Sequence, residues 1–77
     1  MQKLKVLSEL NPGESGVIES YTDPDVELKM LDMGCTPGES FSIRSLAPLG
    51  DPMLIALEGS QLAIRRTEAA FIIIRNS

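Results

Sequence analysis

The side chains that most often carry catalysis or bind metals are sparse in this sequence. It has no histidine, and Cys35 is its only cysteine. Histidine is the commonest general base and metal ligand, and a thiol nucleophile or a zinc site needs further nitrogen or sulfur donors. Neither glycine-rich phosphate-binding pattern, Gly-x-x-x-x-Gly-Lys-Ser/Thr or Gly-x-Gly-x-x-Gly, is present. We therefore expect no catalytic residue, no metal site and no cofactor, and interpret Cys35 as a small packing residue.

The closest group of acidic residues has two interpretations. Asp23, Asp25 and Glu27 could supply oxygen ligands to a hard cation, although calcium needs six to eight oxygens and a glycine at the sharp turn of its loop. The same residues also suit the start of a helix. Asp23 is a good N-cap, Pro24 fits the first helical position, and the two following acids lie near the positive end of the helix dipole. The sequence favours the helix start.

This helix is expected to span about residues 24–33 and to stop at Gly34 in a left-handed conformation. Val26, Met30 and Met33 recur at helical spacing and are predicted to face the core. Asp25 and Lys29, four residues apart, could form a weak ion pair. We interpret the remaining apolar residues as exposed and as candidate partner-binding positions: Leu28 and Leu31 on the opposite helix face, and Leu49 in a later loop. The alternative is that the loop around Pro48 and Leu49 folds over the helix leucines.

The rest of the chain reads as short strands separated by glycine and proline. Pro12-Gly13 and Pro37-Gly38 suit type II turns, Gly59-Ser60 suits a two-residue hairpin, and Gly16 inside a strand suggests a bulge or a close backbone approach. One helical turn is expected near residues 67–70. The fold class is therefore mostly β, a small barrel of about five antiparallel strands in one domain, 1–77. The predicted strands are 15–21, 40–46, 53–58, 61–65 and 71–75.

The length and net charge of the chain limit the classes of partner that it is expected to bind. The 77 residues carry a net charge of −4, which repels nucleic acid and anionic lipid. No apolar run approaches the roughly 20 residues that a membrane-spanning helix requires, so direct membrane insertion is not expected. The N-terminal residues have no apolar core long enough for a signal peptide, and a single cysteine cannot form an internal disulfide. We expect a cytoplasmic protein.

Four stretches of the chain together resemble the FeoA family. Residues 30–39 (MLDMGCTPGE) are similar to its Leu-x-x-Leu/Met-Gly signature followed by Pro-Gly. Residues 62–70 (LAIRRTEAA) resemble its Leu-Arg-Arg-x-Glu-Ala ending, with Ile64 where leucine is usual. Residues 7–14 (LSELNPGE) and the loop at 47–52 (APLGDP) also match. The resemblance runs in order from about residue 4 to residue 75.

The resemblance implies an SH3-like barrel and a small cytosolic bacterial protein. The family works beside FeoB, a membrane ferrous iron transporter with a cytosolic GTPase domain, and has no established catalytic residues. We therefore expect a non-enzymatic adaptor or regulator that acts by protein-protein contact, with weak homo-oligomers left open. One alternative is a generic SH3-like module for proline-rich peptides, although burial of Phe41 and Phe71 would leave it a poor aromatic groove. A further alternative is a protein that binds Fe²⁺ directly.

Overall fold

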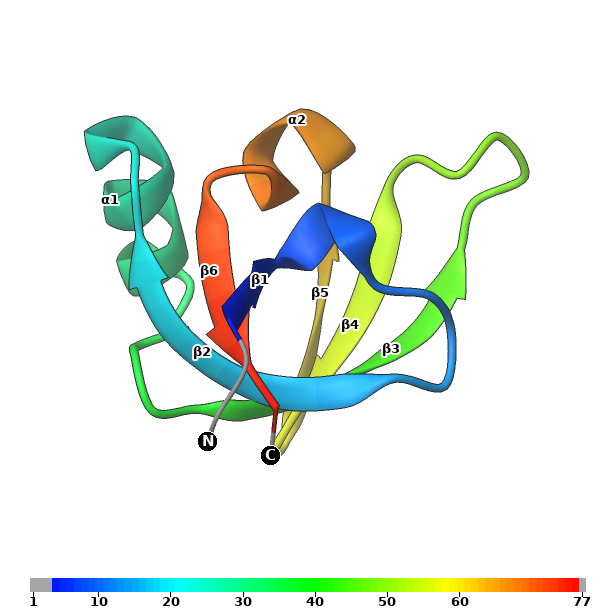
Figure 1. The fold of residues 1–77 in the computed structure, drawn as a ribbon, viewed down its shortest axis with the longest axis horizontal. Helices are drawn as coiled ribbons and strands as arrows, with labels where there is room; N and C mark the ends of the chain where they lie inside the picture. The colour runs from blue at the N-terminus through cyan, green and yellow to red at the C-terminus, as the bar shows by residue number, and fades with distance from the viewer. Residues whose placement is uncertain (1–3, 77) are drawn as a thin grey trace.

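Six antiparallel strands form one strongly bent sheet in the computed structural model, which describes residues 4–76 (Figure 1). The strand order across the sheet is β1-β6-β2-β3-β4-β5. The strands are β1 (Leu4–Val6), β2 (Ser15–Tyr21), β3 (Ser40–Leu46), β4 (Met53–Leu57), β5 (Ser60–Ile64) and β6 (Ile72–Arg75). The helices are the 3-10 turn η1 (Leu7–Glu9), α1 (Pro24–Asp32) and α2 (Arg66–Ala69). The terminal residues of the expected 1–77 domain, 1–3 and 77, lie outside the described residues.

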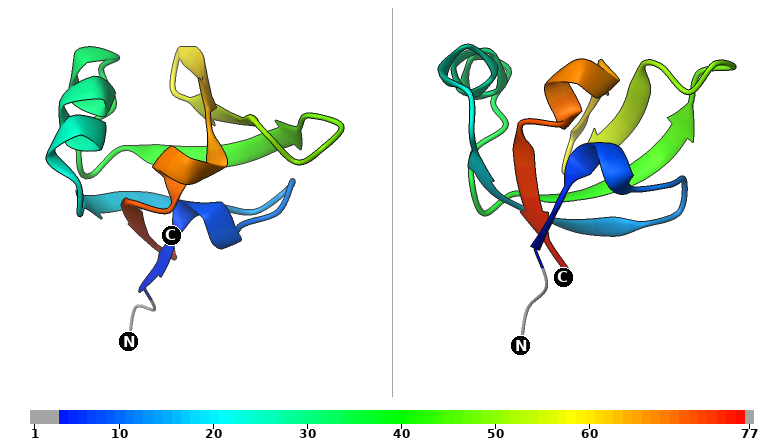
Figure 2. Two further views of the ribbon diagram at one scale, coloured as in Figure 1. Left: turned by 90° about the horizontal axis from the view of Figure 1, so that it is seen from above. Right: turned by 45° about the horizontal axis from the view of Figure 1, so that its top comes forward.

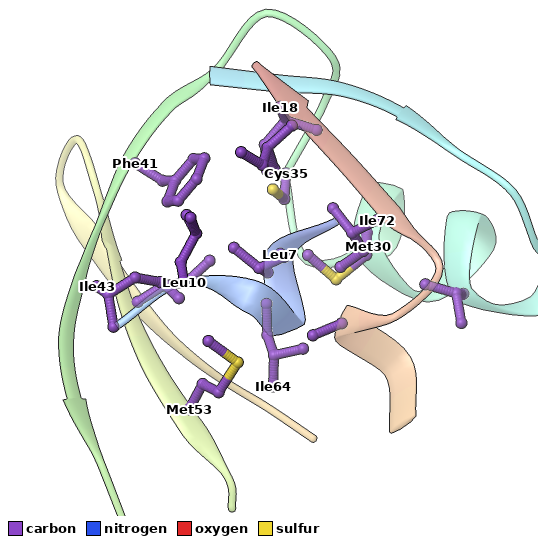
Figure 3. Close-up of a cluster of buried hydrophobic side chains, with 14 residues drawn as sticks. Leu7, Leu10, Ile18, Met30, Cys35, Phe41, Ile43, Met53, Ile64 and Ile72 are labelled. Carbon is purple, nitrogen blue, oxygen red and sulfur yellow. The ribbon is translucent and has the colours of Figure 1, made fainter. Parts of the chain in front are cut away.

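The core fills the inside of the bent sheet (Figure 3). Alternate residues of the strands point inward, as their period of two predicts. Helical residues close the open ends, with Leu7 of η1 and Met30 of α1 almost completely buried. No polar or charged residue of the described chain is buried. The strands contribute Ile18, Phe41, Ile43, Met53, Ile55, Ile64, Ile72 and Ile74.

The mostly-β barrel expected from the sequence is confirmed, with one strand more than predicted. β1 pairs with β6 in the register Leu4↔Arg75, Lys5↔Ile74 and Val6↔Ile73. Three residues are too few to show a strand's alternation in the sequence, which explains why β1 was missed. The last strand begins at Ile72, one residue later than predicted, because Phe71 belongs to the turn after α2. Phe71 is 43% exposed, so the expectation that it is buried was wrong.

The hairpin between β4 and β5 differs from its prediction by one residue. Leu57 pairs with Ser60, so the two loop residues are Glu58 and Gly59, not Gly59 and Ser60. Gly59 takes the second central position with φ of 81°. A glycine at either central position can supply a positive φ, and the sequence alone did not distinguish the two.

Of the two alternatives predicted for Gly16, the close backbone approach is confirmed. A Cβ atom built on this residue would lie 2.7 Å from the Arg75 carbonyl oxygen of β6 and 3.3 Å from the Phe41 ring of β3. β2 lies between β6 and β3 in the sheet. At this position, only a residue without a side chain avoids a clash with the Arg75 carbonyl and the Phe41 ring.

Candidate docking surface on α1

The start of α1 is built as the sequence predicts. The Asp23 carboxylate accepts hydrogen bonds from the backbone N–H groups of Asp25 (3.1 Å) and Val26 (3.0 Å), and Pro24 occupies the first turn. The acidic cluster therefore begins a helix. In residues 4–76, no three or more His, Cys, Asp or Glu side chains are grouped so that they could hold a metal ion.

The end of α1 is fixed by a Schellman motif. The N–H of Gly34 donates to the Leu31 carbonyl at 3.0 Å, and the N–H of Cys35 donates to the Met30 carbonyl at 2.9 Å. Gly34 has φ of 83°, as predicted for the helix stop. The helix ends at Asp32, and Met33 is its C-cap.

The predicted core face of α1 is confirmed at two positions of three. Val26 and Met30 are buried, with 8% and 1% of their surface exposed. Met33 is 36% exposed, so its assignment to the core was wrong. Met33 lies at the end of the helix, one residue after Asp32, where the core no longer covers its side chain.

The opposite face of α1 carries the two leucines that the sequence singled out. Leu28 is 69% exposed and Leu31 is 41% exposed, as expected from their position about 60° apart, roughly opposite the buried face. At 100° per residue, Glu27 lies on one side of this pair, and Asp25 and Asp32 lie on the other. All three acids are exposed. We call Leu28 and Leu31 the leucine pair.

The only basic residue of α1 faces away from the leucine pair. Lys29 Nζ lies 2.5 Å from Glu68 Oε2 of α2, in place of the predicted pairing with Asp25. Glu68 also accepts a hydrogen bond from the Arg65 backbone N–H at 3.2 Å. The hydrogen bond from Lys29 lowers the pKa of the Glu68 carboxyl below its ordinary value, although desolvation opposes this. Glu68 thereby caps the backbone N–H of Arg65 at the start of α2, but nothing in the sequence indicates that Lys29 and Glu68 form a pair.

Tyr21, the last residue of β2, links the segment after α1 to the sheet by a hydrogen bond. Its hydroxyl donates a hydrogen bond to the Cys35 carbonyl at 2.6 Å. Burial, with the contact to Cys35 as the next cause, raises the pKa of Tyr21 well above its ordinary value. Burial likewise raises the pKa of the Cys35 thiol, whose side chain has no exposed surface. The interpretation of Cys35 as a packing residue is confirmed.

Leu49 lies at the tip of the β3–β4 loop, and 95% of its surface is exposed. The loop stands at the opposite side of the molecule from α1 in every view (Figures 1 and 2). The alternative that this loop folds over the helix leucines is therefore wrong. Leu49 and the leucine pair do not form one continuous surface.

Arg66 holds this loop in place. Its guanidinium donates to the Gly50 carbonyl (3.3 Å) and the Ser8 carbonyl (3.0 Å), and its backbone N–H donates to Asp51 Oδ1 (2.9 Å). One residue of α2 thus joins the loop to η1. The guanidinium thus bonds backbone carbonyl groups of two segments that are distant in the sequence.

A family model decides the family of the chain. The model of the FeoA domain matches residues 5–76. The chain belongs to the FeoA family. This family is associated with ferrous iron transport, and its members are small accessory domains.

Solved FeoA structures have the same fold. The FeoA-like protein of Clostridium acetobutylicum is 31% identical, with a TM-score of 0.87 over 96% of this chain and 87% of that one. FeoA of Chlorobium tepidum is 33% identical, with a TM-score of 0.85 over 94% and 70% of the two chains. FeoA of Stenotrophomonas maltophilia, a prokaryotic SH3 domain protein in complex with zinc, is 27% identical, with a TM-score of 0.77 over 91% and 88%. The SH3-like architecture is thus common to this FeoA chain and its relatives.

In the described part of this FeoA chain, none of the helices is long and apolar enough to cross a membrane.

Proposed function

We propose that this FeoA protein is a non-enzymatic accessory protein that regulates a membrane ferrous iron transporter of the FeoB type by direct contact on its cytoplasmic side. One observation carries the proposal: a pair of exposed leucines lies on a firmly held helix, in a chain whose family is associated with ferrous iron transport. The leucine pair is the proposed main contact.

The leucine pair would supply part of the free energy of a regulatory association, and other contacts would add to it. Burying a fully exposed leucine side chain contributes about 1.5–3 kcal/mol, so Leu28 and the partly exposed Leu31 would supply a few kcal/mol together. α1 is also fixed at both ends, by the Asp23 cap and the Schellman motif, and along its side by Lys29 and Glu68. A helix that is already ordered loses little entropy on binding, so more of the contact energy appears as affinity.

Leu49 is proposed as a second, separate contact. It is the most exposed of the large apolar side chains in the described residues, and Arg66 holds its loop in one position. Because it lies on the opposite side from α1, one flat surface cannot cover both. The transporter would have to reach around the barrel, or a different segment of it would bind here.

The aromatic residues make the peptide-binding alternative weaker. Phe41 is buried, and Tyr21 is partly buried with its hydroxyl bonded to the Cys35 carbonyl. Phe71 alone is well exposed, and proline-rich peptides are bound in grooves lined by several aromatic rings. These contacts favour an adaptor that docks through aliphatic side chains.

Affinity capture tests the proposal. The tagged protein serves as bait for membranes of the same organism solubilised in mild detergent, and bound proteins are identified by mass spectrometry. We expect recovery of a polytopic membrane protein that contains a GTPase domain. Recovery of no such protein would contradict the proposed function. A bait in which Leu28 and Leu31 are both replaced by alanine controls for capture by unrelated surfaces and should retain much less of the transporter.

A further inference from the structure

We propose that the transporter surface that receives the leucine pair is an apolar groove bordered by lysine and arginine side chains. This inference rests on the proposed function and specifies the chemistry of the partner. It follows from the charges on α1, which lie on both sides of the leucine pair.

Most of the net charge of the protein lies in the segment that contains α1. Residues 23–32 contain four carboxylates and one lysine, a formal charge of −3 within a chain total of −4. Asp23 is committed to the helix cap. The other three carboxylates, on Asp25, Glu27 and Asp32, are exposed, and none of them takes part in an ion pair or side-chain hydrogen bond within residues 4–76.

The single lysine of the helix does not compensate these charges at the docking face. Its ammonium group lies 2.5 Å from Glu68 Oε2, so the positive charge is neutralised next to α2. What α1 presents to a partner is therefore an apolar strip with acidic borders on both sides. A surface that buries the strip must come close to the carboxylates, and basic groups at its border would turn that approach from repulsive to attractive.

The same charges argue against two other occupants. If α1 packed on α1 of a second copy, the carboxylates of both helices would face each other across the contact. Packed helices lie about 8–10 Å apart, which is comparable to the Debye length of about 8–10 Å, so physiological salt would weaken the repulsion without removing it. An anionic lipid surface would be repelled in the same way. A basic, apolar protein groove is the occupant that fits both features.

Binding measurements at several salt concentrations test the inference. The probe is the purified FeoB-type transporter of the same organism, reconstituted in nanodiscs of zwitterionic phosphatidylcholine, and association and dissociation are followed by biolayer interferometry. Between 50 and 500 mM NaCl we expect Kd of the wild-type protein to rise by about tenfold, mainly through slower association. The double variant Glu27→Gln/Asp32→Asn should bind several-fold more weakly at low salt and depend less on salt.

A charge-matched variant controls for net charge. Glu14→Gln/Glu58→Gln removes two carboxylates from other parts of the surface and should leave the association rate close to that of the wild type. Wild-type binding that is indifferent to salt and to Glu27→Gln/Asp32→Asn overturns the inference but leaves the proposed function intact. Absence of wild-type binding at every salt concentration overturns the proposed function itself. Sedimentation velocity that shows a dimer lost in Leu28→Asp would assign the leucine pair to a second copy and also overturn the inference.

Discussion

Lys29 Nζ of α1 and Glu68 Oε2 of α2 lie 2.5 Å apart, although 39 residues separate them in the chain. The pair joins the helix that follows β2 to the turn that precedes β6. It also directs the Lys29 ammonium group, the only positive side-chain charge of α1, toward α2. The negative charges beside the leucine pair are not compensated by Lys29, because its ammonium group pairs with Glu68.

Replacing Glu68 by glutamine should lower stability slightly and in a pH-dependent way. The pKa of Glu68 is lowered in the folded protein, so its contribution is present above the unfolded carboxyl pKa and is lost as the pH falls through the folded value. Both side chains are partly exposed, which limits the effect to about 0.2–1 kcal/mol. Urea unfolding of both proteins at pH 7 should show this difference, and the difference should be smaller at pH 3. An equal difference at both pH values would mean that the charge of Glu68 is not the cause.

Met30→Ala should lower the free energy of unfolding by about 2–5 kcal/mol, because a buried side chain is removed and a cavity remains. Met33→Ala is the matched control on the same segment. Its side chain is 36% exposed, and the loss should stay below about 1 kcal/mol. Chemical denaturation measures both. Equal losses for the two variants would contradict the position of the helix end.

Gly16→Ala should be more damaging than a glycine replacement that only strains the backbone. Its new Cβ would lie 2.7 Å from the Arg75 carbonyl, and backbone cannot move aside as a flexible side chain can. We expect a loss of about 1–3 kcal/mol or more, as in overpacked cores. Gly34→Ala, with φ of 83° and no neighbour within 4 Å, should cost only the strain of about 1–2 kcal/mol. The order of the two melting temperatures checks this, and a higher value for Gly16→Ala would contradict it.

Local sequence signals predicted most of the fold. The N-cap at Asp23, the helix stop at Gly34 and the strand at 40–46 each depend on residues close in the chain, and all three are confirmed. Errors arose where one residue decides between equivalent patterns, as in the register of the β4–β5 hairpin. The short β1 is stabilised by its pairing with β6, which lies at the other end of the sequence.

The candidate site was predictable only in part. Helical spacing was sufficient to place Leu28 and Leu31 on the outer face. The positions of Leu49 and Glu68 relative to α1 depend on how the barrel closes, and local spacing contains no information about contacts between segments so far apart. For the same reason, the charge pattern of the docking face is not predictable from the sequence, because it depends on the ion pair between Lys29 and Glu68.

Direct binding of Fe²⁺ can be measured separately from docking. The sequence has no histidine, and its one cysteine is buried with a raised thiol pKa, which disfavours the thiolate form that binds metals. Isothermal titration under anaerobic conditions should therefore detect no binding tighter than micromolar. Tighter binding would replace the adaptor by a protein that senses iron itself, and the zinc complex of the Stenotrophomonas maltophilia relative makes Zn²⁺ the natural second titrant.

The central claim is that the leucine pair docks on the transporter without contributing to the core. The most direct test is the affinity of the Leu28→Asp/Leu31→Asp double variant for the reconstituted FeoB-type transporter, measured together with its melting temperature. We predict that binding is lost while the melting temperature changes by no more than a few degrees, because both side chains are exposed. Wild-type affinity in the double variant, or a variant that does not fold, would contradict the account.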